Sequence, residues 1–334
     1  MKEIEYGNIP RDAFSGYRKP LLSGLLIGLA VVVATLLLGD LKGAVGIWQA
    51  FDLRYLPFIF LLAPLNYVFR YIKWNYYLKL AGLYPDAKMN RLIFLSGLSM
   101  AVTPGKIGEL LKCYLLKEHM GAPVSVTSSI VMAERLSDGI SMVILASFGV
   151  LVYAHGFYAL LAIFFFLAAL VFVFHFDAFF GYLERLLKKC PFWRGFMQKS
   201  AEFLREFQGN ARRLFSLPSL LFAVGIGVIS WGFEGLVIFL AVKAFGGEIS
   251  ILGSIFVVSF SSLLGALSLL PGGLGVAEGS IMALLLLIGL GREMAAATTL
   301  VTRFSTLWLG VAIGLAGFYL LQRKFFRKEN TDES

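Results

Sequence analysis

The chain has 334 residues, of which 58% are hydrophobic and 15% are charged, and its mean hydropathy is +0.78. Soluble domains are about 45–50% apolar and about 25% charged, so this composition excludes an ordinary cytosolic globule and a disordered chain. In a membrane protein, a formal net charge of +9 marks cytoplasmic loops and not a nucleic-acid partner. Two distant cysteines and three scattered histidines form no metal motif and no disulfide framework, so we expect no metal and no cofactor.

Apolar stretches of about 20 residues, the length that crosses a bilayer core, recur along the chain. Residues 1–20 are polar and show no cleavable signal peptide, so the first apolar run is expected to remain as an anchor. We predict an all-α polytopic membrane domain over residues 21–321 and a polar tail over residues 322–334. Six full spans are expected: Leu21–Leu38, Tyr55–Tyr77, Val124–Tyr153, Phe157–Phe176, Pro218–Phe245 and Met294–Leu321.

Two further apolar stretches are interrupted by proline and glycine. Leu92–Leu116 is broken at Thr103-Pro104-Gly105-Lys106, and Leu252–Leu290 is broken at Pro271-Gly272-Gly273-Leu274-Gly275. Proline inside a helix removes a backbone hydrogen bond, and broken backbone survives in lipid only where protein or a wet cavity surrounds it. We therefore expect two re-entrant helical hairpins, with kinked full spans as the alternative.

Lysine and arginine are distributed unevenly among the segments that join these spans. With the N-terminus in the cytoplasm and each hairpin returning to its own side, 24 of the 30 Lys and Arg are cytoplasmic, including five from Arg70 to Arg91. Positive charge marks the cytoplasmic face, so we expect the cytoplasmic membrane with both termini inside. Residues 177–216 mix charges with Phe, Leu and Trp, which predicts amphipathic helices on the inner leaflet or a soluble helical linker.

The two halves of the chain resemble each other around the interruptions. Pro271 follows Pro104 by 167 residues, and Arg303 follows Arg135 by 168 residues. Each half, over residues 55–153 and 218–321, reads helix, hairpin, helix, and the spans between them give the halves opposite orientations. Paired interrupted segments in inverted halves are typical of transporters that bind their substrate near the bilayer midplane.

Ionisable residues inside the predicted spans are candidate site residues, because each costs about 2.5–3.5 kcal/mol at a helix centre. Arg135 and Arg303 are candidates for gripping an anionic headgroup, since guanidinium donates paired bonds to phosphate. Backbone N–H groups at the glycine-rich breaks would form a second anion-binding device. The predicted substrate-binding set is Arg135, Arg303, Lys106, Glu109, Glu134, Asp138, Glu234, Glu278, Pro104, Gly105, Gly108, Pro271, Gly272, Gly273 and Gly275.

The acidic members of this set have two interpretations. They orient the arginines or bind a coupling cation, or else they form internal charge pairs that only join helices. Arg303 has no nearby acid on its own helix, so its partner is expected to be Glu278, Glu234 or a ligand. Aromatic residues near one helix end, from Tyr67 to Tyr77, are interpreted as an interfacial belt, with a sugar-stacking platform as the alternative.

Three segments in this order, Thr103–Glu109, Glu134–Asp138 and Pro271–Glu278, resemble the signatures of the lysyl-phosphatidylglycerol synthase transmembrane-region family, also called flippase-like proteins. The resemblance covers roughly Leu21 to Leu321 and implies movement of lipid between leaflets. In the best-studied relatives a soluble domain transfers lysine to the lipid. Only a short polar tail follows Leu321 here, so we do not expect lysyl transfer.

These observations predict a transporter and not an enzyme, with no catalytic residue. The expected substrate is an anionic or zwitterionic phospholipid or a polyprenyl-linked precursor, and envelope or glycan-synthesis proteins are candidate partners. The alternatives are a non-catalytic scaffold of such a pathway, a transporter of a small soluble anion and, more remotely, a membrane-embedded transferase. Replacing Arg303 with Ala is expected to abolish translocation while leaving the protein folded.

Overall fold

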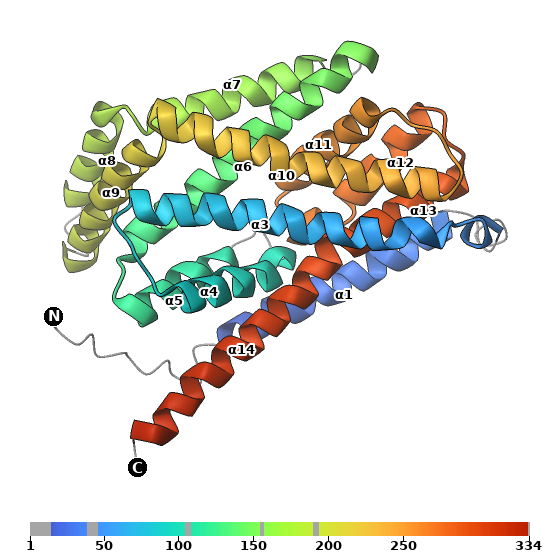
Figure 1. The fold of residues 1–334 in the computed structure, drawn as a ribbon. Coiled ribbons are helices and arrows are strands. Elements are labelled where there is room, and N and C mark those ends of the chain that lie inside the picture. The colour runs from blue at the N-terminus through green and yellow to red at the C-terminus, as the bar shows by residue number, and fades with distance from the viewer. Residues whose placement is uncertain (1–14, 39–45, 104–107, 154–156, 190–193, 333–334) are drawn as a thin grey trace.

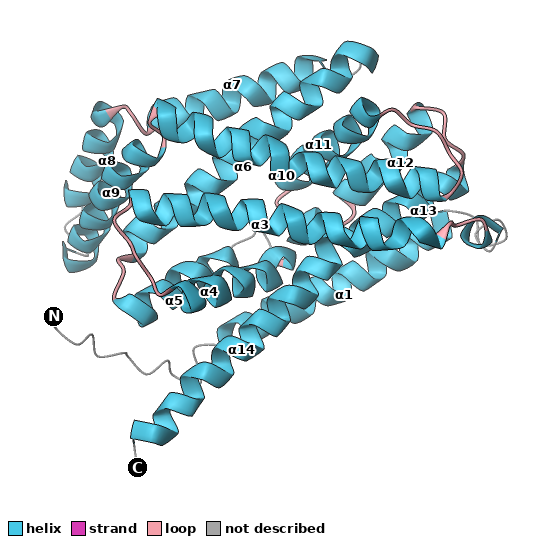
Figure 2. Ribbon diagram, viewed as in Figure 1, coloured by secondary structure: helices cyan, strands magenta, loops and turns pink. Residues whose placement is uncertain are grey.

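The computed structural model describes residues 15–38, 46–103, 108–153, 157–189 and 194–332, and within these ranges all regular structure is helical (Figures 1 and 2). A helix satisfies its own backbone hydrogen bonds, which an apolar chain in lipid requires. The α-helices are α1 (Ser15–Leu38), α3 (Leu56–Leu80), α4 (Ala87–Ser99), α5 (Leu111–Met120), α6 (Val124–Tyr153), α7 (Phe157–Val173), α8 (Asp177–Lys189), α9 (Arg194–Leu214), α10 (Leu217–Ala244), α11 (Ile251–Leu267), α12 (Val276–Leu287), α13 (Arg292–Arg303) and α14 (Leu309–Asp332).

Three described helical stretches are long and apolar enough to cross a membrane, namely Leu53–Leu80, Leu217–Ala244 and Arg292–Arg323. The last of these comprises α13, a π-helical turn called η7 (Phe304–Trp308) and the start of α14. A fourth exists if Leu160–Val173 and Asp177–Leu186, which meet at a bend of 69°, count as one span. Each of the six predicted spans coincides with a helix, which agrees with a membrane protein.

Both interrupted stretches fold as pairs of short helices that contact each other. α4 packs against α5, and α11 packs against α12 across the 3-10 turn η6 (Pro271–Gly273). The four helices have 13, 10, 17 and 12 residues, so each is too short to cross a bilayer core alone. Both interrupted stretches are therefore broken into contacting helix pairs, and their re-entry on one side of the membrane stays a prediction. Pro104, Gly105 and Lys106 lie outside the described residues.

Contacts between the two halves come in matching pairs. The long helix α3 packs along α10, and the two lie beside each other across the middle of Figure 1. α14, the last long helix, packs on α4 of the first hairpin, whereas α6 packs on α11 of the second hairpin. Each half thus covers the hairpin of the other with its own last long helix.

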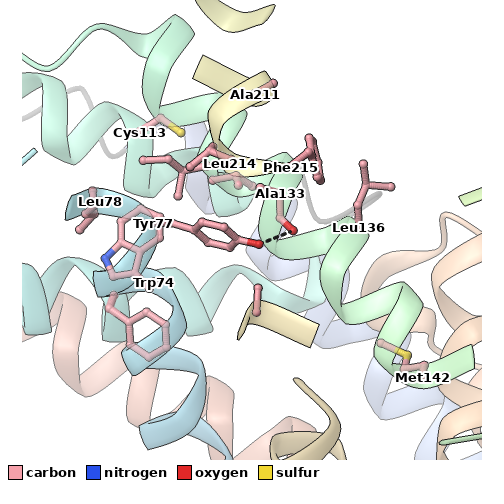
Figure 3. Packing of buried hydrophobic residues seen from close by; sticks show 14 of the residues in the cluster. Trp74, Tyr77, Leu78, Cys113, Ala133, Leu136, Met142, Ala211, Leu214 and Phe215 are labelled. Carbon is pink, nitrogen blue, oxygen red and sulfur yellow. Dashed lines mark hydrogen bonds between the residues drawn. The ribbon is translucent and has the colours of Figure 1, made fainter. Parts of the chain in front are cut away.

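A large cluster of buried hydrophobic residues packs the helices together (Figure 3). Trp74 and Tyr77 of α3 are fully buried, and Trp74 Nε1 donates to Asn90 Oδ1 over 2.9 Å. Cys113 of α5 and Leu214 of α9 belong to the same cluster. The prediction of an interfacial belt is therefore wrong for Trp74 and Tyr77, because both rings lie in the core.

The loop over residues 177–216 contains two helices, α8 and α9, as its amphipathic pattern predicts. α9 packs against α8 and against α6, and its side chains Ala211 and Leu214 are fully buried. Much of the apolar face of α9 thus covers the bundle. The two helices are therefore docked on the bundle, and contact with the inner leaflet stays a prediction.

Three cations that the charge count assigned to cytoplasmic segments lie on helices of the bundle instead. Arg70 and Lys73 belong to α3, and Lys112 belongs to α5. The side chains of Lys73 and Lys112 are buried. Both lysines are paired with carboxylates, and pairing makes buried charge tolerable, which a count of charges along the chain does not reveal.

Candidate functional site

A cavity lies where the two halves meet, and both predicted arginines line it. Its walls come from both hairpins, that is from α4 and the residues between α4 and α5, and from α11, the η6 turn and α12. The long helices α3, α6 and α10, the end of α13, η7 and the start of α14 complete them. Among the described residues, five charged ones line it: Arg70, Arg135, Arg303, Glu109 and Glu234. The cavity thus brings together residues as distant in the sequence as Arg70 and Arg303, which are 233 residues apart. Its described lining holds more guanidinium groups than carboxylates.

Arg135 projects from α6 and pairs with two carboxylates. Its Nε lies 3.1 Å from Glu109 Oε2, and its Nη1 lies 3.7 Å from Asp138 Oδ2. Its Nη2 is buried and donates no hydrogen bond to any described residue. A buried donor without an acceptor is costly, so this nitrogen is suited to an anionic ligand atom.

Arg303 stands at the last position of α13, directly before the π-helical turn η7. Its Nε donates to Glu278 Oε1 over 2.5 Å, and its Nη2 donates to the carbonyl oxygen of Gly272 over 3.0 Å. Glu278 is therefore the partner, as one of the stated candidates predicts. Arg303 thus joins α13 to the η6 turn through Gly272 and to α12 through Glu278. The π-helical turn that follows it is a feature frequent at functional sites.

The two halves use the same device at the cavity. In each, an arginine of the helical stretch that follows the hairpin pairs with a glutamate that follows the helix break, Arg135 of α6 with Glu109 and Arg303 of α13 with Glu278. The side chains of Arg135 and Arg303 are 23% and 13% exposed, and both glutamates are buried. These pairs place one guanidinium from each half on a shared cavity.

The first described backbone N–H groups after the breaks are already occupied. Gly108 N–H donates to Thr103 Oγ1 over 2.9 Å, and Gly275 N–H donates to Glu278 Oε2 over 2.7 Å. Glu278 thereby caps the N-terminus of its own helix by accepting from the backbone of the N-cap residue, which is one half of a capping box. The prediction that the breaks expose amides for an anion is wrong at these two positions, because local side chains accept from both.

Glu134 and Asp138 belong to an ion-pair cluster that does not line this cavity. Lys112 Nζ donates to Glu134 Oε2 over 2.6 Å and lies 4.1 Å from the centroid of the Trp74 ring. Lys73 forms an ion pair with Asp138, and both side chains are almost fully buried. These acids fit the interpretation of internal pairing. Among the described residues there is no group of three acidic, histidine or cysteine side chains placed to hold a metal.

Glu234 lines the cavity from α10 and meets a polar group of α3. Asn66 Nδ2 donates to Glu234 Oε1 over 2.7 Å, and Ser230 Oγ donates to Asn66 Oδ1 over 3.0 Å. Glu278 and Glu234 were the two candidate partners of Arg303, and the ion pair forms with Glu278.

Sequence reasoning missed two cavity residues, Arg70 and Trp231. Arg70 makes no hydrogen bond or ion pair with any residue in the described ranges, and Trp231 Nε1 is buried without an acceptor there. A polar stripe gives a signal that would have found Arg70. Asn66, Arg70 and Lys73 stand at helical spacing on one face of an otherwise apolar helix.

Comparison with known proteins identifies relatives that match different shares of this chain. The sequence model described as "Lysylphosphatidylglycerol synthase TM region" matches residues 23–314. A UPF0104 membrane protein of Pyrococcus horikoshii is 23% identical over 87% of this chain and 94% of its own. One of Methanocaldococcus jannaschii is 25% identical over 70% of this chain and 98% of its own. One of Methanothermobacter thermautotrophicus is 32% identical, but the match covers only 34% of each chain.

Proposed function

This chain belongs to the lysylphosphatidylglycerol synthase TM region family, and we propose that it moves an amphiphile with an anionic or zwitterionic headgroup between the two leaflets of a membrane. The substrate class comprises phospholipids and polyprenyl-linked phosphates. The protein performs no chemical step in this proposal, and the headgroup binds in the cavity between the halves.

The observation that carries this proposal is the set of donors on the cavity wall. Arg70 has no ion pair among the described residues, Arg135 Nη2 has no acceptor, and Trp231 Nε1 is buried without one. The residues that carry these three donors, on α3, α6 and α10, thus line one cavity beside the paired Arg303. Phosphate oxygens accept several charge-assisted bonds at once, which matches such a set.

The proposed architecture comprises six full spans and two re-entrant hairpins arranged as an inverted repeat. The exchange of long helices between halves and the two similar arginine–glutamate pairs support it. The bias of Lys and Arg toward residues 1–20, 177–216 and 322–334 supports cytoplasmic termini. Rocking of one half against the other around the cavity would then expose it to each leaflet in turn.

The test measures movement of a fluorescent phosphatidic acid across the bilayer of proteoliposomes. Arg70→Gln removes a guanidinium that stabilises no described ion pair. We expect it to slow movement about tenfold or more, the effect of losing one charge-assisted hydrogen bond, without lowering thermal stability. Arg91→Gln is the matched control, because Arg91 is exposed on α4 and, within the described ranges, donates its one hydrogen bond to the carbonyl oxygen of Ala87 on its own helix.

The other outcomes identify the rival functions. Uptake of radiolabelled inorganic phosphate without lipid movement would assign a soluble anion to the same donors. If neither lipid nor phosphate moves with the unmodified protein, the scaffold function replaces the transporter. If Arg70→Gln moves lipid at the unmodified rate, the cavity is not the headgroup site.

A further inference from the structure

A second, apolar hollow opens beside the polar cavity. This groove lies between α6, α9 and α11 and is lined mainly by hydrocarbon side chains, among them Met132, Met142, Phe203, Phe207 and Leu263. Four of its lining residues also line the polar cavity: Glu109, Arg135, Gly265 and Ala266. The groove and the cavity therefore share a wall whose polar part is the Arg135–Glu109 pair.

The shared wall is thin where α11 contributes its two small residues. A side chain at Gly265 would contact Gly273 of the η6 turn, 3.4 Å from that Cα atom, so α11 and the break lie backbone to backbone there. The groove is open to the side, because Met132, Phe203 and Leu269 are 41%, 42% and 70% exposed. Leu269 also holds a positive φ of 55°, a conformation that non-glycine residues rarely adopt and that clusters near functional sites.

The outer wall of the groove is held in place by polar contacts between α9 and α6. Ser125 Oγ donates to Glu206 Oε2 over 2.5 Å, and Asn210 Nδ2 donates to Ser129 Oγ over 2.6 Å. Phe203 and Phe207 of α9 stack at 6.2 Å between ring centroids on the groove side. Glu206 and Asn210 are four residues apart and therefore share the face of α9 that contacts α6. Phe203 and Phe207 lie next to this face.

We infer that this groove binds a hydrocarbon chain of the same molecule whose anionic headgroup occupies the cavity, with Arg135 and Glu109 at the junction of head and chain. The inference rests on the proposed function and adds the location of the chain to it. An amphiphile needs a polar and an apolar compartment in contact, and the shared wall supplies that contact. A small soluble anion would use the donors but would not need the groove.

The test compares long-chain dioleoyl phosphatidic acid with short-chain dibutyryl phosphatidic acid, measured by binding to the purified full-length protein in detergent. Met132 lines the groove but not the cavity, so Met132→Trp fills the groove alone. We expect about tenfold weaker binding of the long-chain lipid, the loss expected when one or two methylene groups leave an apolar contact. Binding of the short-chain lipid should change less than about twofold.

Leu221→Trp is the matched control, since Leu221 is 64% exposed on α10 and lines neither space. Phe203→Asp is a second variant, which places a carboxylate in the groove from the α9 side and should have the same selective effect if Met132→Trp fails to fold. Unchanged long-chain binding in a folded groove variant overturns the inference and leaves the groove to bulk lipid or a partner helix.

The Arg70→Gln variant distinguishes failure of the chain site from failure of the proposed function. If Arg70→Gln weakens both lipids and the groove variants weaken neither, the headgroup site stands and the chain site does not. If Arg70→Gln weakens neither lipid, the proposed function itself fails. Equal weakening of both lipids by Met132→Trp would also overturn the chain site, because the effect would then lie at the headgroup.

Discussion

Asn66 Nδ2 donates to Glu234 Oε1 over 2.7 Å, and the two residues stand 168 residues apart in the chain. Arg135 and Arg303 have the same separation. Residues at matching positions of two repeats touch each other only where they lie close to the axis that relates the repeats. The contact between α3 and α10 therefore supports the proposed inverted repeat, with the axis passing beside these two helices.

Replacing Asn66 should weaken this junction. Asn66→Leu removes the donor to Glu234 and the acceptor for Ser230, and buried polar groups that lose a partner cost about 1–3 kcal/mol. We expect a clear drop in the thermal unfolding temperature in detergent. Glu234→Gln is the control, because its amide oxygen still accepts from Asn66 and should retain most of the stability. An equally large drop in Glu234→Gln would contradict the assigned contact.

The Arg303–Glu278 pair leads to a different expectation from the one based on sequence alone. Arg303→Ala leaves Glu278 buried without its cation, and breaking such a pair costs about 3–5 kcal/mol. The variant should therefore lose stability as well as transport. Arg303→Met with Glu278→Leu should recover much of the stability, because replacing both charges avoids the unpaired carboxylate, yet it should remain inactive. Recovery of transport in the double variant would show that the pair serves packing only.

Much of the fold was readable from the sequence, because it depends on local composition. Every predicted span coincides with a helix, and Pro271 and the glycines after it mark the second break. The partners of the buried charges could not be predicted from the sequence in the same way. Lys73 and Lys112 were counted as cytoplasmic, since their burial depends on Asp138 and Glu134 of another helix, and no periodicity in α3 or α5 reveals that distant pairing. The Arg303–Glu278 contact was foreseeable as a candidate because few acids lie within the predicted spans.

Trp231 and Trp74 should respond in opposite ways to the same substitution. Trp231→Phe removes an N–H that has no acceptor within the described part of the chain, so stability should change by less than about 1.5 kcal/mol. Binding of phosphatidic acid should fall about fivefold, because a cavity donor is lost. Trp74→Phe deletes the bond to Asn90 in the core and should lower stability without weakening binding. Binding of phosphatidic acid and thermal unfolding of both variants check the pair, and equal binding by Trp231→Phe and the unmodified protein would remove Trp231 from the site.

Gly273 and Gly279 of the second hairpin give a final matched comparison. Gly273 has a φ of +66°, and a Cβ atom there would lie 2.9 Å from the Cα atom of Gly265. Gly273→Ala therefore combines backbone strain with a clash between backbones, and we expect a loss of about 2 kcal/mol or more. Gly279 lies within α12, and a Cβ atom there meets nothing within 4 Å. Gly279→Ala should stabilise by about 0.5–1 kcal/mol, because alanine favours the helix. Thermal unfolding of both variants checks the contrast, and a neutral Gly273→Ala would show that η6 and α11 do not approach so closely.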